Sequence, residues 1–399
     1  MGRNRRTATL VSVAVLALAL PASLATPAGA AAQSAPVFQG TTDVHAKVGK
    51  AFSLTVQAVA NPAAAITATT ALPSGLTLVG GGGGQAVLSG TFGSSGTFVV
   101  GLEAVNALGK ATEHLTFTVT IPVSSYCGQR TGAPTTTKVM VIYEENHSYS
   151  SIVGSPSAPR INAIARHCGA ATNYRALTHP SLPNYLASTS GQSYASSPWT
   201  SDCGPTGHCV TSNNNIFNQV GPSRWKGYVE SMSSNCSTSG PNVLARHNPA
   251  EYYTDLRATC AVDDVPLGTT KSGALRSDVN AGTLPAFATV TPNAVDDMHD
   301  GSIARGDAWL SQWMSIITSG PDYRSGHLTV LVVWDEGSGS GNVPSTVLML
   351  AISPYVQNGV RSATGFTHYS LLKAAEDVAG VPELGAAASA HSLRSAFGF

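Results

Sequence analysis

Hydrophobic and polar residues alternate along residues 36–122, and a period of two is typical of β-strands. Four stretches rich in β-branched residues stand out, at residues 52–56, 86–90, 97–100 and 115–120. Turn-forming residues separate them at short intervals, which predicts an all-β sandwich. Acidic residues and histidines are scarce here, so we expect a spacer or a weak adhesion module rather than a reactive site.

The pattern changes at about residue 135, where apolar runs begin to alternate with helical patterns. Buried strands are predicted at residues 138–143, 284–291, 328–334 and 347–352. Helices are predicted at residues 161–167, 184–190, 307–318 and 369–378. This alternation predicts an α/β domain over residues 135–399, with a mainly parallel sheet and helices on both faces. Residues 123–134 are rich in proline, serine, glycine and threonine and are predicted to be the linker.

Residues 1–32 have the features of a secretory signal peptide. Arginines precede a mostly apolar run over residues 8–20, which is too short to span a bilayer. Ala-Gly-Ala at residues 28–30 fits a cleavage site, and cleavage after Ala32 fits equally well. The Arg-Arg pair at residues 5–6 leaves a twin-arginine route open, and an uncleaved anchor is the competing interpretation. Because no later stretch could span a membrane, we expect a secreted protein without a transmembrane segment in its mature part.

The cysteines support export, because there is an even number of them and disulfides form in oxidising compartments. They are Cys127, Cys168, Cys203, Cys209, Cys236 and Cys260. No C-x-x-C spacing is present, which argues against a zinc ribbon. Three disulfides are expected, and the pairing stays open except that a short Gly/Pro loop favours Cys203–Cys209.

The amino-acid composition excludes some classes of protein. Lysine and arginine total 22 and aspartate and glutamate total 22, so the chain lacks the basic excess of a nucleic-acid binder. Hydrophobic residues make up 43%, which excludes intrinsic disorder. Only 11% of the residues are charged, so any cluster of carboxylates is informative.

Acidic and amide residues cluster directly after three of the predicted strands, at residues 144–148, 292–300 and 334–337. In open α/β sheets, ligands bind beyond the carboxyl ends of the strands. Carboxylates crowded together there would repel one another unless a cation neutralised them. Oxygen ligands with a few histidines predict a divalent metal used for phosphoryl or sulfuryl chemistry. The alternative is that these acids cap helices or lie in solvated turns, as we expect for Asp307 at the start of its helix.

The best candidate nucleophile is Ser181, in the segment Thr178-His179-Pro180-Ser181-Leu182-Pro183-Asn184-Tyr185. It lies just before a predicted helix, where free N–H groups and the helix dipole favour an anion such as a phosphate. A metal beside the hydroxyl would lower its pKa. His179, two residues earlier, is a candidate to protonate the leaving group. The alternative is a serine that caps the helix without any chemistry.

Four motifs occur in order at residues 145–149, 179–185, 293–301 and 334–337, and together they resemble the bacterial phosphoesterase family. This family lies in the alkaline-phosphatase-like superfamily and includes secreted acid phosphatases, phosphatidylinositol-3-phosphate phosphatases and phospholipases C. The resemblance runs from about residue 137 to residue 395. Independently, residues 36–122 resemble the immunoglobulin-like domains of bacterial secreted proteins.

The family resemblance implies a role for individual residues. The implied metal ligands are Glu145, Asn146, Asp335, Glu336, Asp297, Asp300 and His368. The implied catalytic residues are Ser181 as nucleophile, Asn184 on a phosphoryl oxygen, and His179 and His299. Tyr185 stands where a sulfatase has arginine, which argues against a sulfatase, and no G-x-S-x-G motif supports an esterase.

The sequence therefore predicts a secreted, divalent-metal-assisted phosphomonoesterase of the acid phosphatase type that forms a phosphoserine intermediate. Its expected partner is a phosphomonoester substrate, with phosphatidylinositol 3-phosphate among the candidates, and no nucleic acid. One alternative is a phosphodiesterase of the phospholipase C type. Another is a surface-binding protein with a degenerate catalytic domain. The identity and number of the metal ions, the natural substrate and the oligomeric state are left open.

Overall fold

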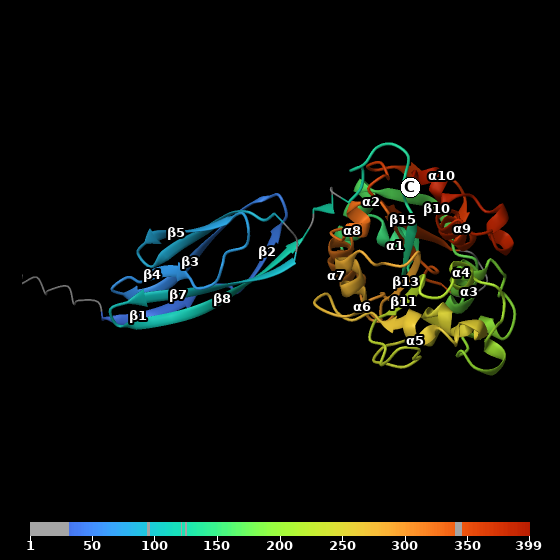
Figure 1. Ribbon diagram of the computed structural model, residues 1–399, viewed down its shortest axis with the longest axis horizontal. Coiled ribbons are helices and arrows are strands. Elements are labelled where there is room, and N and C mark those ends of the chain that lie inside the picture. Colours follow the sequence, from blue (N-terminus) through green and yellow to red (C-terminus); the bar gives the residue numbers. More distant parts are fainter. Residues whose placement is uncertain (1–31, 94–95, 121, 124–125, 340–344) are drawn as a thin grey trace, which may run out of the picture.

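The computed structural model describes residues 32–399 apart from residues 94–95, 121, 124–125 and 340–344 (Figure 1). The predicted signal peptide lies outside the described residues except for Ala32. An all-β region comes first along the chain and an α/β region follows, each with its own hydrophobic core.

The all-β region contains the strands predicted from the alternating pattern. Their bounds are β1 Ser34–Gln39, β2 Asp43–Lys47, β3 Ala51–Asn61, β4 Ala65–Ala68, β5 Leu76–Gly82, β6 Gln85–Thr91, β7 Gly96–Asn106 and β8 Gly109–Thr120. Over the described residues they form two four-stranded sheets, in the orders β1-β3-β6-β5 and β2-β8-β7-β4. Alternate side chains turn inward, and the rings of Phe52, Phe92 and Phe117 pack together with centroids 5.5–5.7 Å apart. The two-sheet arrangement follows from the pattern, while the likeness to immunoglobulin domains stays a prediction.

The α/β region is built on one mixed sheet. Its strands are β9 Lys138–Glu144, β10 Gly169–Arg175, β11 Trp225–Val229, β12 Asp264–Pro266, β13 Phe287–Thr291, β14 Leu328–Trp334, β15 Thr346–Ile352, β16 Arg361–Ser362 and β17 Phe366–Thr367. In the described residues the order is β12-β11-β13-β9-β14-β15-β10-β16, with β17 also paired to β10. Only β15 runs antiparallel to its neighbours in this set of pairings. The predicted α/β fold with a mainly parallel sheet is confirmed.

Helices follow most of these strands. The longer ones are α2 Pro159–His167, α3 Ser181–Ser190, α6 Ala274–Ala281, α7 Ile303–Ile317 and α9 His368–Ala379. The short ones are α1 Tyr149–Ile152, α4 Ile216–Val220, α5 Cys260–Asp263, α8 Pro321–Arg324 and α10 Leu393–Phe397. All four predicted helices are present, and α3 packs on α9 while α2 packs on α7. The prediction for α3 started too late, since the helix begins at Ser181 and accommodates Pro183 in its first turn.

Asp307 caps a different helix from the one the sequence suggests. Helix α7 begins four residues earlier, at Ile303, and Ser302 caps it. The buried carboxylate of Asp307 instead accepts hydrogen bonds from the backbone N–H groups of Arg160 (2.9 Å) and Ile161 (2.7 Å). These are first-turn donors of α2, which have no partner within their own helix. The expectation that Asp307 caps its own helix is therefore wrong.

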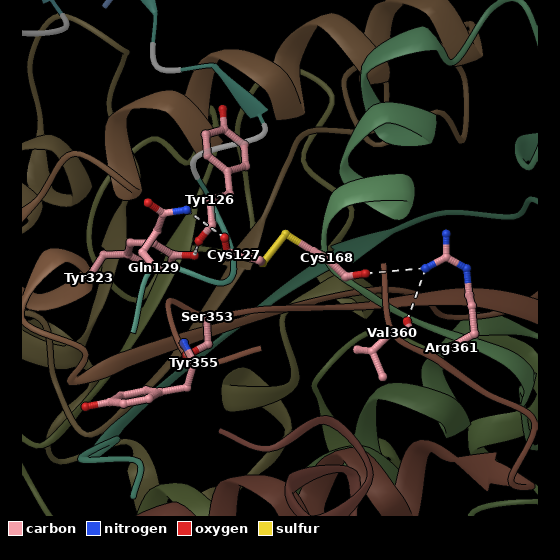
Figure 2. Close-up of a disulfide and its surroundings, with 9 residues drawn as sticks. All are labelled: Tyr126, Cys127, Gln129, Cys168, Tyr323, Ser353, Tyr355, Val360 and Arg361. Carbon is pink, nitrogen blue, oxygen red and sulfur yellow. Dashed lines mark hydrogen bonds between the residues drawn. A yellow bond between two sulfur atoms is a disulfide. The ribbon is translucent and has the colours of Figure 1, made fainter. Parts of the chain in front are cut away.

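Three disulfides lie in the α/β region, as the even number of cysteines predicts. The favoured Cys203–Cys209 bridge is confirmed, and the others join Cys127 to Cys168 and Cys236 to Cys260. Figure 2 shows the Cys127–Cys168 disulfide beside Tyr126, which is buried. Residues after it are held as well, because the N–H groups of Gln129 and Arg130 donate to the carbonyl of Pro354 (both 2.9 Å). The α/β core thus takes in residues that composition alone assigns to the linker.

The sheet has two chemically different edges. The parallel strands β9, β13, β14 and β10 all end at one edge, and the acidic motifs and Ser181 follow these ends. The antiparallel strand β15 ends at the opposite edge, close to the Cys127–Cys168 disulfide (Figure 2). Among the described helices, none has both the length and the apolar character needed to cross a bilayer.

Candidate active site

Neighbouring strands deliver the acidic motifs to one place. Because β9 lies between β13 and β14, the turn after it is held from both sides. The Glu145 N–H donates to the carbonyl of Asp297 (2.9 Å), and the Asp335 N–H donates to the carbonyl of Glu144 (3.0 Å). The three predicted acidic clusters therefore converge, and the side chains of Glu145, Asp297 and Asp335 are all at most 1% exposed.

The candidate nucleophile faces this cluster from the start of α3. The Ser181 hydroxyl donates to Glu145 Oε2 (3.1 Å), and its polar group opposes the rise in the pKa values of Asp335 and Glu336. It makes no capping hydrogen bond to the helix, because Pro180 is the residue at the cap position. The interpretation of Ser181 as a mere N-cap is thus not what the structure shows. One turn later, the Tyr185 hydroxyl donates to Glu145 Oε1.

His247 completes the cluster, although the sequence did not single it out. It is 1% exposed, and its ring lies parallel to that of Tyr185, with an interplanar angle of 7°. Nε2 is 3.3 Å from Glu145 Oε1 and Nδ1 is 3.2 Å from Asp297 Oδ2. Burial lowers the pKa of His247 well below its ordinary value, so we treat the imidazole as neutral. It lies in a short 3₁₀ turn, Ala245–His247, that follows no strand, so the strand-end rule could not reveal it.

A second carboxylate–histidine pair lies beside Ser181. His179 Nδ1 is 2.8 Å from Glu336 Oε2, and both side chains are largely buried. Burial lowers the pKa of His179 and raises that of Glu336 to about 9. The Asn146 N–H reaches Asp335 Oδ1 (3.4 Å) from a left-handed turn residue, φ 48°. The predicted residues Asn146, His179 and Glu336 are therefore all at this site.

His368 is close to the site but has no nitrogen to spare. Its Nε2 lies 2.6 Å from the backbone carbonyl of Asp335, and its Nδ1 lies 3.0 Å from the Tyr174 hydroxyl. Burial lowers its pKa to about 4, so the ring is neutral and uses both nitrogens for these contacts. In this structure His368 positions the turn that carries Asp335, and we leave it out of the proposed ligand set.

Asn184 supports the loop that leads to the nucleophile. Its Oδ1 accepts hydrogen bonds from the N–H groups of Leu177 (2.9 Å) and Thr178 (3.3 Å), and its Nδ2 donates to the Thr178 carbonyl (2.9 Å). These contacts fix the approach of the chain to Ser181. The predicted contact of Asn184 with a phosphoryl oxygen stays a prediction.

His299 and Asp300 lie at the rim rather than in the cluster. His299 Nδ1 is 2.8 Å from Asp300 Oδ1, and the Asp300 side chain is 61% exposed. His299 Nε2 lies 3.1 Å from Nη2 of Arg246, the residue before His247. Arg246 is the second residue of the site that the sequence did not single out.

The site concentrates negative charge that nothing nearby balances fully. Burial raises the pKa of Glu145 well above its usual value and that of Asp335 to about 7, and it raises the pKa of Asp297 to about 7. Repulsion from Asp335 and Asp297 adds to the effect at Glu145. Arg246 opposes the shifts at Asp297 and Glu336 without abolishing them. Ionising all of these groups would require a cation from outside the chain.

The buried side-chain atoms without a hydrogen bond are of the chemical types that bind divalent cations. Several buried side-chain atoms make no aligned hydrogen bond, although some of them lie 2.8–3.3 Å from a histidine nitrogen or a carboxylate oxygen. They are Asn146 Oδ1, His179 Nδ1, His247 Nε2, Asp297 Oδ2, Asp335 Oδ2 and Glu336 Oε2. Carboxylate and amide oxygens with imidazole nitrogens are the donors that divalent metals use. Within the described ranges, no group of three or more such side chains is already spaced as a formed metal site. Charge and donor type therefore support a cation, while its coordination geometry is not preformed.

Comparison with known proteins gives a consistent result. A model of the phosphoesterase family matches residues 155–382. A phosphatidylinositol-3-phosphatase of Mycobacterium tuberculosis is 30% identical over 267 residues, which cover 66% of this chain and 84% of that protein.

A fungal acid phosphatase and a solved structure are similar to this chain at lower identity. A phosphate-repressible acid phosphatase of Penicillium chrysogenum is 28% identical over 226 residues, so the match covers 54% of this chain and spans about half (52%) of that protein. A solved structure from Vibrio parahaemolyticus, a protein in the alkaline phosphatase superfamily, has 11% identity and a TM-score of 0.46, over 68% of this chain and 74% of that one.

Proposed function

This chain belongs to the phosphoesterase family, and from that premise we propose that it is an exported, metal-assisted phosphomonoesterase with Ser181 as its nucleophile. It is a hydrolase of phosphoric ester bonds, as the family and the named relatives indicate. One observation carries the finer proposal. The Ser181 hydroxyl heads a ten-residue helix and donates to the buried carboxylate of Glu145.

The start of α3 is suited to an anionic substrate. The first N–H groups of a helix have no partner within it and bear partial positive charge. In this turn Leu182 N donates to Asp202 and Pro183 has no N–H. The Ser181 N–H is therefore the first-turn donor left for a phosphoryl oxygen, directly beside the attacking hydroxyl.

The reaction runs in two steps. Ser181 gives its hydroxyl proton to Glu145, which already accepts a hydrogen bond from it, and Oγ attacks phosphorus. The bond to the leaving oxygen breaks, and a phosphoserine forms. His179, whose Nδ1 lies 2.8 Å from Glu336 Oε2, has Nε2 available to give a proton to the leaving alkoxide. Water then returns a proton to His179 and attacks phosphorus, and the bond to Ser181 breaks as Ser181 takes its proton back from Glu145. Inorganic phosphate leaves.

A divalent cation would be held by oxygens of Glu145, Asn146, Asp335 and Glu336. On the other side of Glu145, Asp297 and His247 offer further ligand atoms. When bound, it would stabilise the serine alkoxide and the charge on the phosphoryl oxygens. The chain's own part is to orient Ser181 and to supply and remove protons. The buried, unpaired carboxylate oxygens support this ligand set.

Export and substrate class belong to the same proposal. Three disulfides suit an oxidising compartment, and residues 1–32 have the composition of a signal peptide. The mycobacterial relative bears the name of an enzyme for phosphatidylinositol 3-phosphate, which makes phosphoinositides the first substrates to try.

The test is hydrolysis of p-nitrophenyl phosphate and phosphatidylinositol 3-phosphate, with and without added Mg²⁺, Mn²⁺ or Zn²⁺. Ser181→Ala should lower turnover by on the order of 10³-fold or more, because the nucleophile is lost. After an acid quench, mass spectrometry should find one phosphoryl group on the Ser181 peptide of the wild type and none on that of the variant.

Ser190→Ala is the matched control, since its hydroxyl lies in the same helix and donates to the Leu186 carbonyl (2.8 Å). It should keep the wild-type rate. Full activity of Ser181→Ala would overturn the nucleophile assignment. Release of a head group from phosphatidylcholine, without phosphate release from monoesters, would identify a phospholipase C instead. No hydrolysis with any metal would favour a binding protein.

A further inference from the structure

A continuous line of polar contacts runs along the rim of the site to the start of α3. Arg246 is its centre. Arg246 Nε lies 3.4 Å from Asp202 Oδ2, and the other oxygen of Asp202 accepts the N–H of Leu182 (2.9 Å), the residue after the nucleophile. On its other side Arg246 Nη2 lies 3.1 Å from His299 Nε2. The guanidinium is therefore held between two partners and tied to the helix that carries Ser181.

Donor and acceptor chemistry fixes the state of His299. A guanidinium can only donate hydrogen bonds, so His299 Nε2 must present its lone pair to Arg246. The ring proton then sits on Nδ1 and donates to Asp300 Oδ1 (2.8 Å). In this arrangement His299 Nε2 accepts a hydrogen bond from Arg246 and orients it. This gives the two predicted residues, His299 and Asp300, a positioning role.

Arg246 retains donors that the protein does not use. It has five N–H groups, and in the described structure only Nη2 donates a hydrogen bond, to His299. Its Nε is buried and has no aligned acceptor, although Asp202 lies within ion-pair distance. The side chain is 22% exposed, so it reaches solvent at the mouth of the site.

The guanidinium acts across the whole cluster. Its charge opposes the raised pKa values of Glu336 and Asp297 and contributes to the lowered pKa of His247. Glu336 lies on the His179 side of the site, and Asp297 lies on the His247 side. Because Asp202 ties Arg246 to Leu182, the residue after Ser181, a phosphoryl group attacked by Ser181 would present an outward oxygen towards a cation with free N–H donors.

We propose that Arg246, oriented by Asp202 and His299, binds this outward phosphoryl oxygen and makes the enzyme select dianionic monoesters over monoanionic diesters. The inference rests on the proposed function and names the group that sets its substrate class. A monoester has a second ionised oxygen near neutral pH, whereas a diester has an alkyl or aryl group on that oxygen. A fixed guanidinium with parallel donors favours the fully ionised phosphoryl group.

The experiment compares kcat/KM for p-nitrophenyl phosphate and bis(p-nitrophenyl) phosphate with the metal that gives the highest wild-type rate. Arg246→Ala should lower the monoester value by on the order of 10²–10³-fold and the diester value by no more than about tenfold. Arg246→Lys should recover only part of the loss, because an ammonium group lacks the planar donors. Arg305→Ala is the matched control, since Arg305 is a surface arginine paired with Asp296 (2.7 Å). It should change neither value.

Asp202→Asn tests the positioning role. It keeps an oxygen for the Leu182 N–H but loses the charge that holds Arg246. It should lower the monoester rate in the wild-type background and have no further effect in Arg246→Ala. An equal effect in both backgrounds would remove Asp202 from the assignment.

The outcomes separate this proposal from the function on which it rests. Equal losses on both esters, or no loss, in Arg246→Ala would overturn the selectivity assignment while leaving a phosphatase. If the wild type hydrolyses neither ester, the proposed function fails, and calorimetry with inorganic phosphate then decides about Arg246. Weaker phosphate binding by Arg246→Ala, by about tenfold or more, would support the binding role, and equal binding would reject it.

Discussion

Asp335→Asn should abolish activity and yet make the metal-free protein more stable. Asp335 is fully buried among like charges, and its Oδ2 has no hydrogen-bond partner. Asparagine has nearly the same shape and keeps an oxygen for the Asn146 N–H, which lies 3.4 Å away. The substitution therefore removes a buried charge without creating a cavity.

The size of the gain follows from the pKa of Asp335, which burial raises from 3.8 to about 7. A raised carboxyl pKa means that the folded state binds more protons, so stability is lost as pH rises from the unfolded value towards about 7. Above that pH, the raised pKa lowers the free energy of unfolding by at most ~4 kcal/mol. Neighbouring carboxylates share the bound protons, which reduces this loss to on the order of 2–4 kcal/mol. Asp335→Asn should regain this free energy of unfolding at about pH 8 and almost none of it at about pH 4.

The assay is urea unfolding of the wild type and the variant at these two pH values, first in EDTA and then with the activating metal. Metal at about 100 times its Kd should stabilise the wild type by ~2.7 kcal/mol. The variant should gain much less, because it lacks one ligand charge. The order of stability of the two proteins should thus depend on the metal.

Asp322→Asn is the matched control, since that buried carboxylate has a partner in Lys138 (2.7 Å) and accepts the Leu284 N–H (3.1 Å). Its substitution should destabilise the protein with and without metal. The reasoning would be refuted if Asp335→Asn were less stable than the wild type in EDTA at about pH 8, or if metal stabilised both proteins equally.

Two further predictions concern positions away from the site. Asp307→Ala should lower the free energy of unfolding by ~3–4 kcal/mol in urea, because it leaves the N–H groups of Arg160 and Ile161 unpaired at the start of α2. Asp307→Asn should lower it by only ~1 kcal/mol, and equal losses would contradict the capping role. Burial raises the pKa of Glu376 to about 7, so Glu376→Gln should raise the free energy of unfolding by ~1–2 kcal/mol at about pH 8 and by little at about pH 4.5. Glutamine keeps an oxygen for the Leu384 N–H, which Glu376 Oε1 accepts. A pH-independent change in thermal unfolding would contradict this prediction.

The sequence was sufficient for the parts of the site that follow apolar strands. Continuous hydrophobic runs located β9, β13 and β14, and parallel strands end at a common edge. The convergence of Glu145, Asp297 and Asp335 follows from those two facts. Ser181 could be singled out because helix starts favour anions, although the helix boundary was misplaced by three residues.

Other parts could not be predicted because their signals are not local. Strand β10, Gly169–Arg175, has a mixed composition, and its pairing with β15 makes it a strand. His247 and Arg246 lie in a loop-rich stretch whose path is fixed by contacts distant in sequence. One example is Asn248, whose side chain donates to both carboxylate oxygens of Asp264 (3.1 and 2.9 Å). No pattern of period two or 3.6 points to such residues.

The misassigned cap has a similar cause. Asp307 lies near the start of an apolar-periodic helix, and sequence position alone makes it a natural cap for that helix. Its actual partners are 147 and 146 residues away, because α2 packs on α7. Local sequence patterns show that an aspartate can cap a helix, and tertiary packing determines which helix it caps.

The Cys127–Cys168 disulfide determines where a mechanical load enters the α/β core. A pull on the chain before Tyr126 first meets the contact of the Tyr126 carbonyl with the Tyr323 hydroxyl. It is then passed through this bridge to the start of β10, and through the hydrogen bonds of Gln129 and Arg130 to the end of β15. Both points lie at the sheet edge opposite to Ser181. In a protein immobilised on a bead through its N-terminal side, the strain would therefore fall on the end of the sheet opposite to Ser181. The loops around Ser181 would stay unloaded and open to solvent.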